Sequence, residues 1–320
     1  MNNTAHIESF EVSFKVEPHN SGLRLDEFMK AMLPRYSRNE LHNIIDTRLV
    51  QKERRFKKGT KVRTGDEFFF LYDKKEKSIK DEDIPILFED NHILIVNKPQ
   101  GMLVHAKNPW GKNDLIQQLR RQRGSKELYL AHRIDRETSG IVLIARTREM
   151  AGKLGEAFID RQVEKEYRAI VFGEVMDEAG IIDMPICGDD KAILRVKMMA
   201  GKGSDLSGAP SITEYQVIKR FEDFTLVKAR PRTGRQHQIR VHFSAIGHPL
   251  VGDKIYKDEK LFLKFIDEGF TEELQRELLL PRQALHASML SFKHPITGDD
   301  IKVEAEMPQD LRDFIDNHSN

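Results

Sequence analysis

Cysteine is nearly absent from this chain of 320 residues, in which Cys187 stands alone. A single cysteine excludes an intramolecular disulfide, and proteins without disulfides are typical of the reducing cytosol. No uncharged apolar run approaches the roughly 20 residues that a membrane-spanning helix needs. Residues 1–5 also lack the basic and apolar regions of a secretion signal. The sequence therefore predicts a soluble, cytoplasmic protein with no membrane partner.

Patterns that bind a metal or a cofactor are absent as well. The chain has no glycine-rich phosphate loop and no cluster of cysteine and histidine residues. His237 and His242 are five positions apart, which differs from the i, i+4 spacing of a metal-binding pair on a helix. The sequence also contains neither an internal repeat nor a low-complexity tract. These absences favour an activity that needs no metal and no cofactor.

Charge is nearly balanced over the whole chain, with a net charge of +1, but it is unevenly distributed. Residues 21–80 hold 16 Lys and Arg against 9 Asp and Glu, a local charge of +7. Residues 258–320 hold 7 against 14, a local charge of −7. A basic lobe is the usual electrostatic mark of a protein that binds a phosphate backbone. We therefore expect the N-terminal part of the chain to contact nucleic acid.

Residues 1–80 are expected to form a small α/β domain and a linker. Residues 7–16 alternate between apolar and polar side chains, as in a half-buried strand, and residues 23–33 have helical spacing that stops at Pro34. Ser37 is a suitable N-cap for a second helix, with Glu40 at the capping-box position. Short strands are predicted around residues 49–50 and 68–71, and the polar residues 74–80 are predicted to form the linker.

Residues 81–320 are predicted to form one larger α+β domain. Apolar runs at residues 86–88, 93–96 and 141–145 indicate buried strands, and strand character recurs at 167–172, 211–219 and 224–229. Helical patterns cover residues 115–121 and 150–159, the latter with Thr147 as its N-cap. Because strands outnumber helices and short turns join them, the sheet should be mixed or largely antiparallel.

A charged segment, residues 132–140, precedes one of these apolar runs. It reads His-Arg-Ile-Asp-Arg-Glu-Thr-Ser-Gly, so that Asp135 lies between Arg133 and Arg136. An arginine within about 4–6 Å lowers the pKa of an aspartate by roughly 1–3, so Asp135 should be ionised. An ionised carboxylate suits nucleophilic attack better than general acid catalysis. By its local pattern alone, the segment is equally consistent with a structural turn whose aspartate pairs with a neighbouring arginine.

The wider chain favours the catalytic interpretation. Residues 132–140 resemble the signature His-Arg-Leu-Asp-Arg-Glu-Thr-Ser-Gly of the large-ribosomal-RNA type of RNA pseudouridine synthases, with Ile134 in place of leucine. Further blocks at residues 96–105, 165–169, 233–253 and 286–298 resemble blocks of that family in the same order. The resemblance covers residues 85–308. It implies an isomerase that converts uridine in RNA to pseudouridine, with ribosomal RNA or transfer RNA as its partner, and we expect a monomer.

The resemblance also implies roles for individual residues. Asp135 is the expected nucleophile, which acts after the uridine has been turned out of the RNA helix. Tyr167 matches a family tyrosine that packs against the target base, although a core tyrosine with a satisfied hydroxyl has the same strand pattern. Arg235 is expected to begin a helix and to hold Asp135 ionised, and a phosphate contact is the alternative. His242 is expected to point into the core from that helix.

The remaining candidates are residues expected to bind the RNA. Arg133 could fill the gap left by the extruded base or bind a nearby phosphate, and Arg136 and His132 flank the same loop. Lys98 and His105 are expected to shape the floor of the pocket.

Parts of the N-terminal domain resemble the S4 RNA-binding domain, namely residues 24–26, 37–38 and 65–66. This resemblance adds Arg38, Arg54 and Arg55 to the candidate RNA contacts. Residues 48–63 carry eight basic residues and one acidic residue, so a solvated charged face is the alternative interpretation. The glycine and asparagine of the usual S4 hairpin are missing from this segment.

Two other functions are consistent with parts of the pattern. One is an RNA-binding protein whose catalytic fold is inert, but such a protein would not need Asp135, Tyr167 or Arg235. The other is a glycoside hydrolase, which generally needs two carboxylates about 5–10 Å apart. Only Asp135 and Glu137 are adjacent candidates for that pair.

Overall fold

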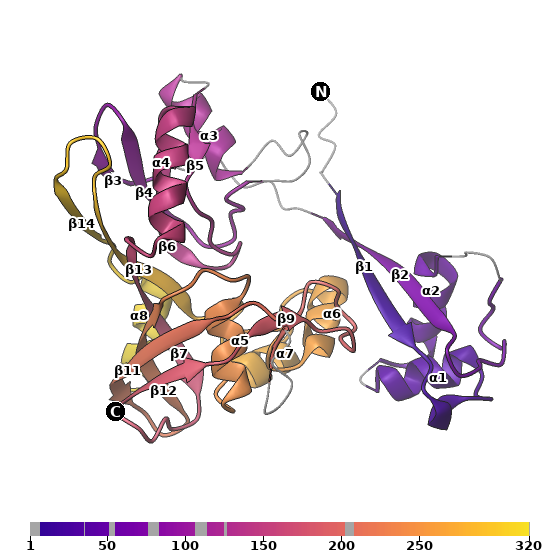
Figure 1. Ribbon diagram of the computed structural model, residues 1–320. Helices are drawn as coiled ribbons and strands as arrows, with labels where there is room; N and C mark the ends of the chain where they lie inside the picture. The colour runs from indigo at the N-terminus through magenta and orange to yellow at the C-terminus, as the bar shows by residue number, and fades with distance from the viewer. Residues whose placement is uncertain are drawn as a thin grey trace. The chain divides into compact units, whose positions relative to one another are not determined.

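The computed structural model describes residues 7–34, 36–50, 55–75, 83–105, 114–124, 127–201 and 208–319 (Figure 1). These residues form two compact units. The first unit combines residues before position 78 with residues 188–197 and 258–271, and the second comprises residues in 78–187, 198–257 and 272–320. The predicted domain boundary at residue 80 falls among residues 76–82, outside the described part of the chain. The two later segments of the first unit were not predicted.

The first unit is built around a two-stranded antiparallel sheet of β1 (Ile7–Lys15) and β2 (Glu67–Lys75). Helices α1 (Leu25–Met32) and α2 (Arg38–Arg48) pack with the sheet around a core that includes Phe14, Phe28 and Phe70. The predicted cap of α2 is confirmed: the Ser37 hydroxyl accepts from the Glu40 N–H, and the Glu40 carboxylate accepts from the Ser37 N–H. This is the α/β arrangement expected from the sequence.

The later segments join the first unit through backbone bonds and ion pairs. The Ser13 N–H donates to the Ile193 carbonyl at 3.1 Å, beside an isolated bridge between Val12 and Leu194. Helix α6 (Glu259–Glu268) contributes Asp267, which accepts a hydrogen bond from Arg48 of α2. The local charge of this unit is therefore partly compensated by acidic residues from late in the sequence.

A ten-stranded sheet forms the second unit, in the order β3-β4-β6-β13-β7-β12-β11-β8, with β14 paired to β13 and β5 to β6. All pairs are antiparallel except β13 with β6. This confirms the α+β class and the mixed, largely antiparallel sheet. The strands are β3 (Ile86–Glu89), β4 (Ile93–Lys98), β5 (Tyr129–Leu130), β6 (Ser139–Ala145), β7 (Glu164–Phe172), β8 (Ala179–Asp183), β11 (Ile212–Arg220), β12 (Phe224–Pro231), β13 (Leu285–Lys293) and β14 (Asp300–Glu304). A short separate ladder joins β9 (Ile186–Gly188) to β10 (Met198–Ala200).

Helices cover both faces of this sheet (Figure 1). Alternate residues of β4 and β6 pack on α4 (Arg148–Ile159) on one face and on α3 (Leu115–Arg123) on the other. Along β7, Ala169 packs with α5 (Gln238–Ala245), whereas Ile170 packs with α8 (Gln309–Asn317). The short helix α7 (Glu272–Leu278) precedes β13. No helix in the described ranges is long and apolar enough to cross a membrane.

One glycine explains how the charged segment 132–140 reaches the sheet. Gly140 in β6 has a φ of 109°, and a Cβ there would lie 2.2 Å from the Ala287 carbonyl oxygen in β13. Only glycine tolerates both this backbone conformation and this close approach. The parallel pairing of β6 with β13 therefore depends on the Ser-Gly end of the segment, and it places the preceding loop beside β7 and β13.

Candidate active site

Asp135 lies in the loop between β5 and β6, and the loop is fixed by backbone bonds. The Thr138 N–H donates to the Asp135 carbonyl at 3.2 Å, as in a tight turn. His132 Nε2 accepts from the Leu143 N–H at 3.0 Å. Because burial lowers the pKa of His132 to about 3, this ring is neutral near pH 7 and serves as an acceptor. The carboxylate of Asp135 is thus presented from a rigid turn.

The Asp135 carboxylate has three nearby partners from later in the chain. Arg240 Nη1 donates to Oδ2 at 2.8 Å, and the Gln283 amide donates to the same oxygen at 3.3 Å. His237 Nε2 lies 3.9 Å from Oδ1, and its Nδ1 is 2.8 Å from the Tyr256 hydroxyl. The other oxygen of Asp135 therefore has no close hydrogen bond among the described residues.

Arg240 is held between two carboxylates. Its Nε and Nη2 bond both oxygens of Asp253, at 2.6 and 3.0 Å, and its Nη1 bonds Asp135. Asp253 is fully buried and also accepts from the N–H groups of Ile255 and Tyr256. The guanidinium lies 4.8 Å from the centre of the Tyr256 ring, within cation–π range. This arrangement fixes the direction in which Arg240 meets Asp135.

These contacts decide the ionisation of Asp135. Burial by itself would raise the pKa of the carboxyl group, because desolvation disfavours the charged form. The neighbouring His237 and Arg240, with the Gln283 amide, oppose this effect and hold the pKa below its usual range. Burial would likewise raise the pKa of Asp253, but the Arg240 guanidinium outweighs this effect and lowers it. Asp135 is therefore an anion at neutral pH, as the sequence predicted.

The prediction that Arg235 pairs with Asp135 is wrong, because Arg240 occupies that position. Arg235 is exposed, and its Nε donates to the Pro210 carbonyl at 3.4 Å. Helix α5 begins at Gln238, since His237 has a left-handed φ of 56° that interrupts the helical path. Arg235 consequently lies in the turn before the helix, whereas Arg240 lies in its first turn and points inward. The expectation for His242 is confirmed: it is fully buried and 2.9 Å from the Thr213 hydroxyl.

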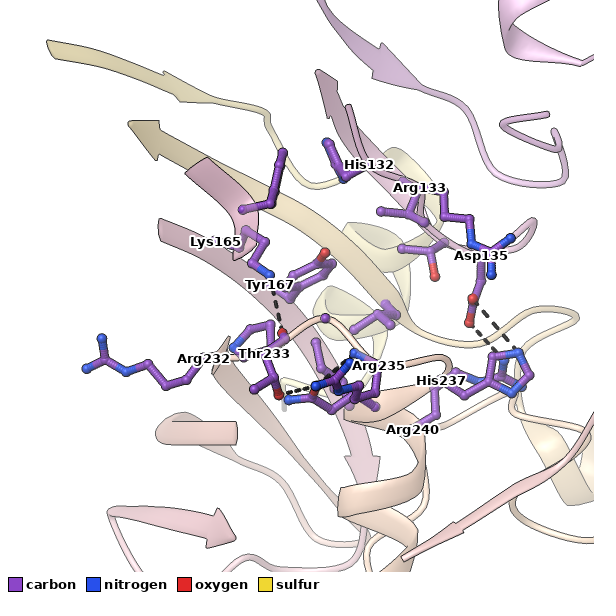
Figure 2. A pocket seen from close by; sticks show the side chains of 18 of the residues that line it. His132, Arg133, Asp135, Lys165, Tyr167, Arg232, Thr233, Arg235, His237 and Arg240 are labelled. Carbon is purple, nitrogen blue, oxygen red and sulfur yellow. Dashed lines mark hydrogen bonds and ion pairs between the residues drawn. The ribbon is translucent and has the colours of Figure 1, made fainter. Parts of the chain in front are cut away.

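Asp135 opens onto a cavity of about 520 Å³ (Figure 2). The residues that line it come mainly from the 131–138 loop, the end of α4, β7, and the turn that leads into α5. Tyr167 lies on this side of β7, and its hydroxyl makes no hydrogen bond within the described part of the chain. Burial and the Asp135 charge raise its pKa, so it remains a neutral phenol. Asp135 is the single carboxylate among the described lining residues.

Cations surround the mouth of this cavity. Arg133 is exposed and, among the described residues, makes no hydrogen bond or ion pair. Lys165 donates to the Thr233 carbonyl at 3.2 Å, and burial lowers its pKa to about 8. Arg232 pairs with Glu214 at 2.9 Å. The mouth of the cavity is therefore suited to an anionic ligand.

Two of the proposed RNA contacts have structural roles instead. Lys98 is fully buried, and its Nζ donates to the carbonyls of Pro99, Met102 and Arg136 at 2.8–3.1 Å. It links the 99–102 turn to the loop that carries Asp135 and cannot reach a ligand, which corrects its assignment as an RNA contact. His132 lines the cavity, but its ring packs 5.0 Å from Phe158 and supports the loop as a neutral group.

The other predicted contacts are not gathered at the cavity. His105 is mostly exposed and lies 3.4 Å from the buried carboxylate of Asp114, and neither His105 nor Arg136 lines the cavity. In the first unit, Arg38 contacts Asp26 at 3.4 Å and Arg55 is exposed. Arg54 lies outside the described residues.

Several residues around Asp135 were not singled out from the sequence. Gln283 donates to both Asp135 and Thr138, and Glu137 pairs with the buried Lys254 at 3.0 Å. The available signal was the presence of charged residues in otherwise apolar surroundings, as in Val251-Gly252-Asp253-Lys254-Ile255. Buried charges are usually paired, so each implied a partner without identifying it. No group of three or more potential metal ligands occurs among the described residues.

Comparison with known proteins agrees with this geometry. The sequence profile of the RNA pseudouridylate synthase family matches residues 92–245. The ribosomal large subunit pseudouridine synthase D of Haemophilus influenzae is 32% identical over 315 residues, which cover 95% of this chain and 94% of that protein. The Escherichia coli protein of the same name is 33% identical over 317 residues, covering 96% and 94%.

A solved structure extends the comparison to the fold. Human RNA pseudouridylate synthase domain containing 4 superposes with a TM-score of 0.57 at 28% identity, covering 73% of this chain and 93% of that one. The sequence relatives span nearly the whole chain, and the loop around Asp135 lies within the residues that the family profile matches. The chain belongs to the RNA pseudouridine synthase family and is an RNA pseudouridine synthase, an isomerase.

Proposed function

We propose that this enzyme converts uridines of ribosomal RNA to pseudouridine with Asp135 as the nucleophile, after the target base has been flipped out of its helix. Support for the RNA class comes from the relatives, whose names place their activity on the large ribosomal subunit. Support for the mechanism comes from one observation above all: Asp135 is an ionised carboxylate that faces a cavity and is fixed by a buried arginine.

The reaction needs little else from the protein. Pseudouridine forms when the bond between N1 of uracil and C1′ of ribose breaks, the base turns, and C5 bonds to C1′. C5 then loses its proton and N1 gains one, so the product is an isomer of uridine. An anionic oxygen beside C1′ can add to the sugar or stabilise the charge that develops there. The Asp135 oxygen that Arg240 does not engage is available for this role, because no described residue donates a hydrogen bond to it and His237 Nε2 lies 3.9 Å away. The Arg240 contact keeps the carboxylate ionised and aimed.

Tyr167 is proposed to pack against the turned uracil. Its ring lies on the cavity wall and its hydroxyl is uncommitted among the described residues, so it can meet a polar edge of the base. Because burial raises its pKa, the phenol can donate a hydrogen bond throughout the neutral range. A cavity of about 520 Å³ is large enough for a nucleotide.

Base flipping costs about a few kcal/mol, which contacts to the RNA must offset. Arg133, with no ion pair among the described residues, is proposed to fill the space left by the base or to bind an adjacent phosphate. For Arg235 we propose the alternative role, a phosphate contact, because this residue is exposed at the same cavity and does not bond Asp135. In the first unit, the basic segment that includes Arg55 is proposed to bind the RNA backbone.

The two competing functions fit the site less well. A glycoside hydrolase would need a second carboxylate at the cavity, but Glu137 is paired with Lys254 and Asp253 with Arg240, and neither lines it. An inert RNA-binding protein would gain nothing from a buried arginine that keeps a partly buried carboxylate ionised at a cavity.

The proposal is tested by mapping pseudouridines in ribosomal RNA from cells with and without the gene, by chemical labelling. We expect one or more large-subunit pseudouridines to disappear on deletion and to return with the wild-type gene but not with Asp135→Asn. Loss of a transfer RNA pseudouridine alone would move the substrate to that RNA class. Restoration by Asp135→Asn would refute the catalytic assignment.

A further inference from the structure

Helix α4 ends beside the cavity in a conformation that is unusual for its sequence. The Gln162 N–H bonds the Ala157 carbonyl at 2.9 Å and the Asp160 N–H bonds the Glu156 carbonyl at 2.8 Å, so the chain reverses tightly. Arg161, just past the helix end, has a φ of 59°. Glycine is the usual residue at this left-handed position, because other residues bring Cβ close to the backbone. Arginine is therefore strained here.

Backbone hydrogen bonds hold this turn, but no side-chain contact of Arg161 within the described residues offsets the strain. Arg161 is exposed, and its side chain makes no hydrogen bond or ion pair with them. It nevertheless lines the same cavity as Asp135. A strained, unpaired side chain at the mouth of an active site is typical of a residue whose partner is the substrate.

Ile159 is a second unusual residue at this helix end. Its side chain is 79% exposed, although the adjacent Phe158 packs against the ring of His132. Ile159 also lines the cavity that contains Asp135. A single exposed isoleucine is ordinary on a protein surface, but this one borders a cavity that must receive part of an RNA helix.

We propose that Ile159 and Arg161 form a binding site for the nucleotide next to the flipped uridine. Arg161 binds the phosphate of that nucleotide, and Ile159 packs against the face of its base, which flipping leaves without its stacked neighbour. Apolar side chains, isoleucine among them, are known to insert between neighbouring bases in nucleic-acid complexes. The inference rests on the proposed function, because it assumes that a flipped uridine occupies the cavity.

The left-handed backbone conformation of Arg161 allows binding and stability to be separated, because replacing this residue by glycine should relieve strain while removing the proposed RNA contact. Arg161→Gly should keep the thermal midpoint or raise it by up to about 3 °C. It should also weaken binding to an unmodified transcript of large-subunit ribosomal RNA by about five- to tenfold at moderate salt. The slope of log K for binding against log salt concentration should become shallower by about 0.7–0.9. Arg161→Gln should match that binding loss without a stability gain, and Arg161→Lys should largely retain binding.

Matched controls separate the site from general surface effects. Arg276 is exposed on α7 and does not line the cavity, so Arg276→Gln should leave affinity and salt slope unchanged. Ile159→Ser should slow single-turnover isomerisation about tenfold, whereas Ile181→Ser, at another exposed isoleucine, should not.

The site would be refuted if Arg161→Gly lowered the thermal midpoint, or if its affinity and salt slope equalled those of the wild type. Equal losses in the Arg161 and Arg276 variants would also refute it. The binding measurements use a transcript that the wild-type enzyme has been shown to modify. Absence of pseudouridine with the wild type would instead refute ribosomal RNA as the substrate and so remove the premise of the site.

Discussion

Arg240 donates to Asp135 across 2.8 Å, and the arginine is the more deeply buried partner, with 6% of its side chain exposed against 29% for the aspartate. The arginine cannot follow a ligand, because Asp253 fixes it from behind. The carboxylate, by contrast, is accessible from the cavity. The pair thus combines a rigid, buried cation with an anion that substrate can reach.

Replacing Arg240 by alanine should impair both folding and catalysis. It leaves the buried Asp253 without its cation, which costs about 3–5 kcal/mol of unfolding free energy. Arg235→Ala removes an exposed arginine and should change stability by less than about 0.5 kcal/mol. Urea unfolding and single-turnover rates at saturating RNA would measure both effects. A larger rate loss in Arg235→Ala than in a folded Arg240→Lys variant would contradict the observed pairing.

Acid should weaken the Arg240 network in a defined pH range. The pKa of Asp253 lies below its unfolded value of about 3.9, so its contribution to stability is present above about pH 4 and is lost as pH falls through the folded pKa. We expect the unfolding free energies of the wild type and Asp253→Asn to converge as pH is lowered from 5 to 2.5. A constant difference over this range would show that Asp253 does not titrate in this way.

Lys98 should matter for stability and not for RNA binding. Lys98→Met leaves buried carbonyls without their donor and should cost about 2–4 kcal/mol. Burial lowers the pKa of Lys98 to about 7, against about 10.4 in the unfolded chain, so the unfolded state binds more protons between these values. The unfolding free energy of the wild type should therefore exceed that of Lys98→Met by an amount that increases as pH rises from 7 to 10.

Urea titrations at several pH values would measure this difference, and RNA affinity of the folded variant should stay within about twofold of wild type. A large loss of affinity with normal stability would return Lys98 to the RNA-binding residues.

The basic segment of the first unit can be tested without truncation, which would break its contacts with residues 188–197 and 258–271. Arg55, Lys57, Lys61 and Arg63 are exposed, and their joint replacement by glutamine should preserve the fold. Each lost phosphate contact should make log K against log salt shallower by about 0.7–0.9. Turnover at saturating RNA should be unchanged. Unaltered affinity and slope would show that this face is only solvated.

Much of the fold could be predicted because its signals are local. Apolar runs located β4 and β6, and Ser37 and Thr147 marked the starts of α2 and α4, where both hydroxyls accept the expected backbone N–H. Helices α6 and α8 were not predicted, and neither was the packing of α6 in the first unit, because that contact joins residues far apart in sequence.

The active site was only partly predictable for a related reason. The loop around Asp135 is a contiguous motif, but its partners Arg240 and Gln283 are 105 and 148 residues away. Choosing between Arg235 and Arg240 required the start of α5. The helix begins at Gln238 because His237 has a left-handed backbone conformation. The side-chain oxygen of Gln238 also accepts hydrogen bonds from the Thr233 hydroxyl and the Arg235 N–H in the preceding turn. Neither feature follows from hydrophobic periodicity.

The central claim is that the Asp135 carboxylate attacks the flipped uridine, and single-turnover isomerisation by Asp135→Asn tests it most directly. The amide keeps the shape of the side chain and removes its charge and nucleophilicity. With a transcript of large-subunit ribosomal RNA at saturation, we expect a rate at least about a thousandfold below wild type, with RNA affinity within about threefold and a cooperative thermal transition. Conversion at a rate near that of the wild type would contradict the account.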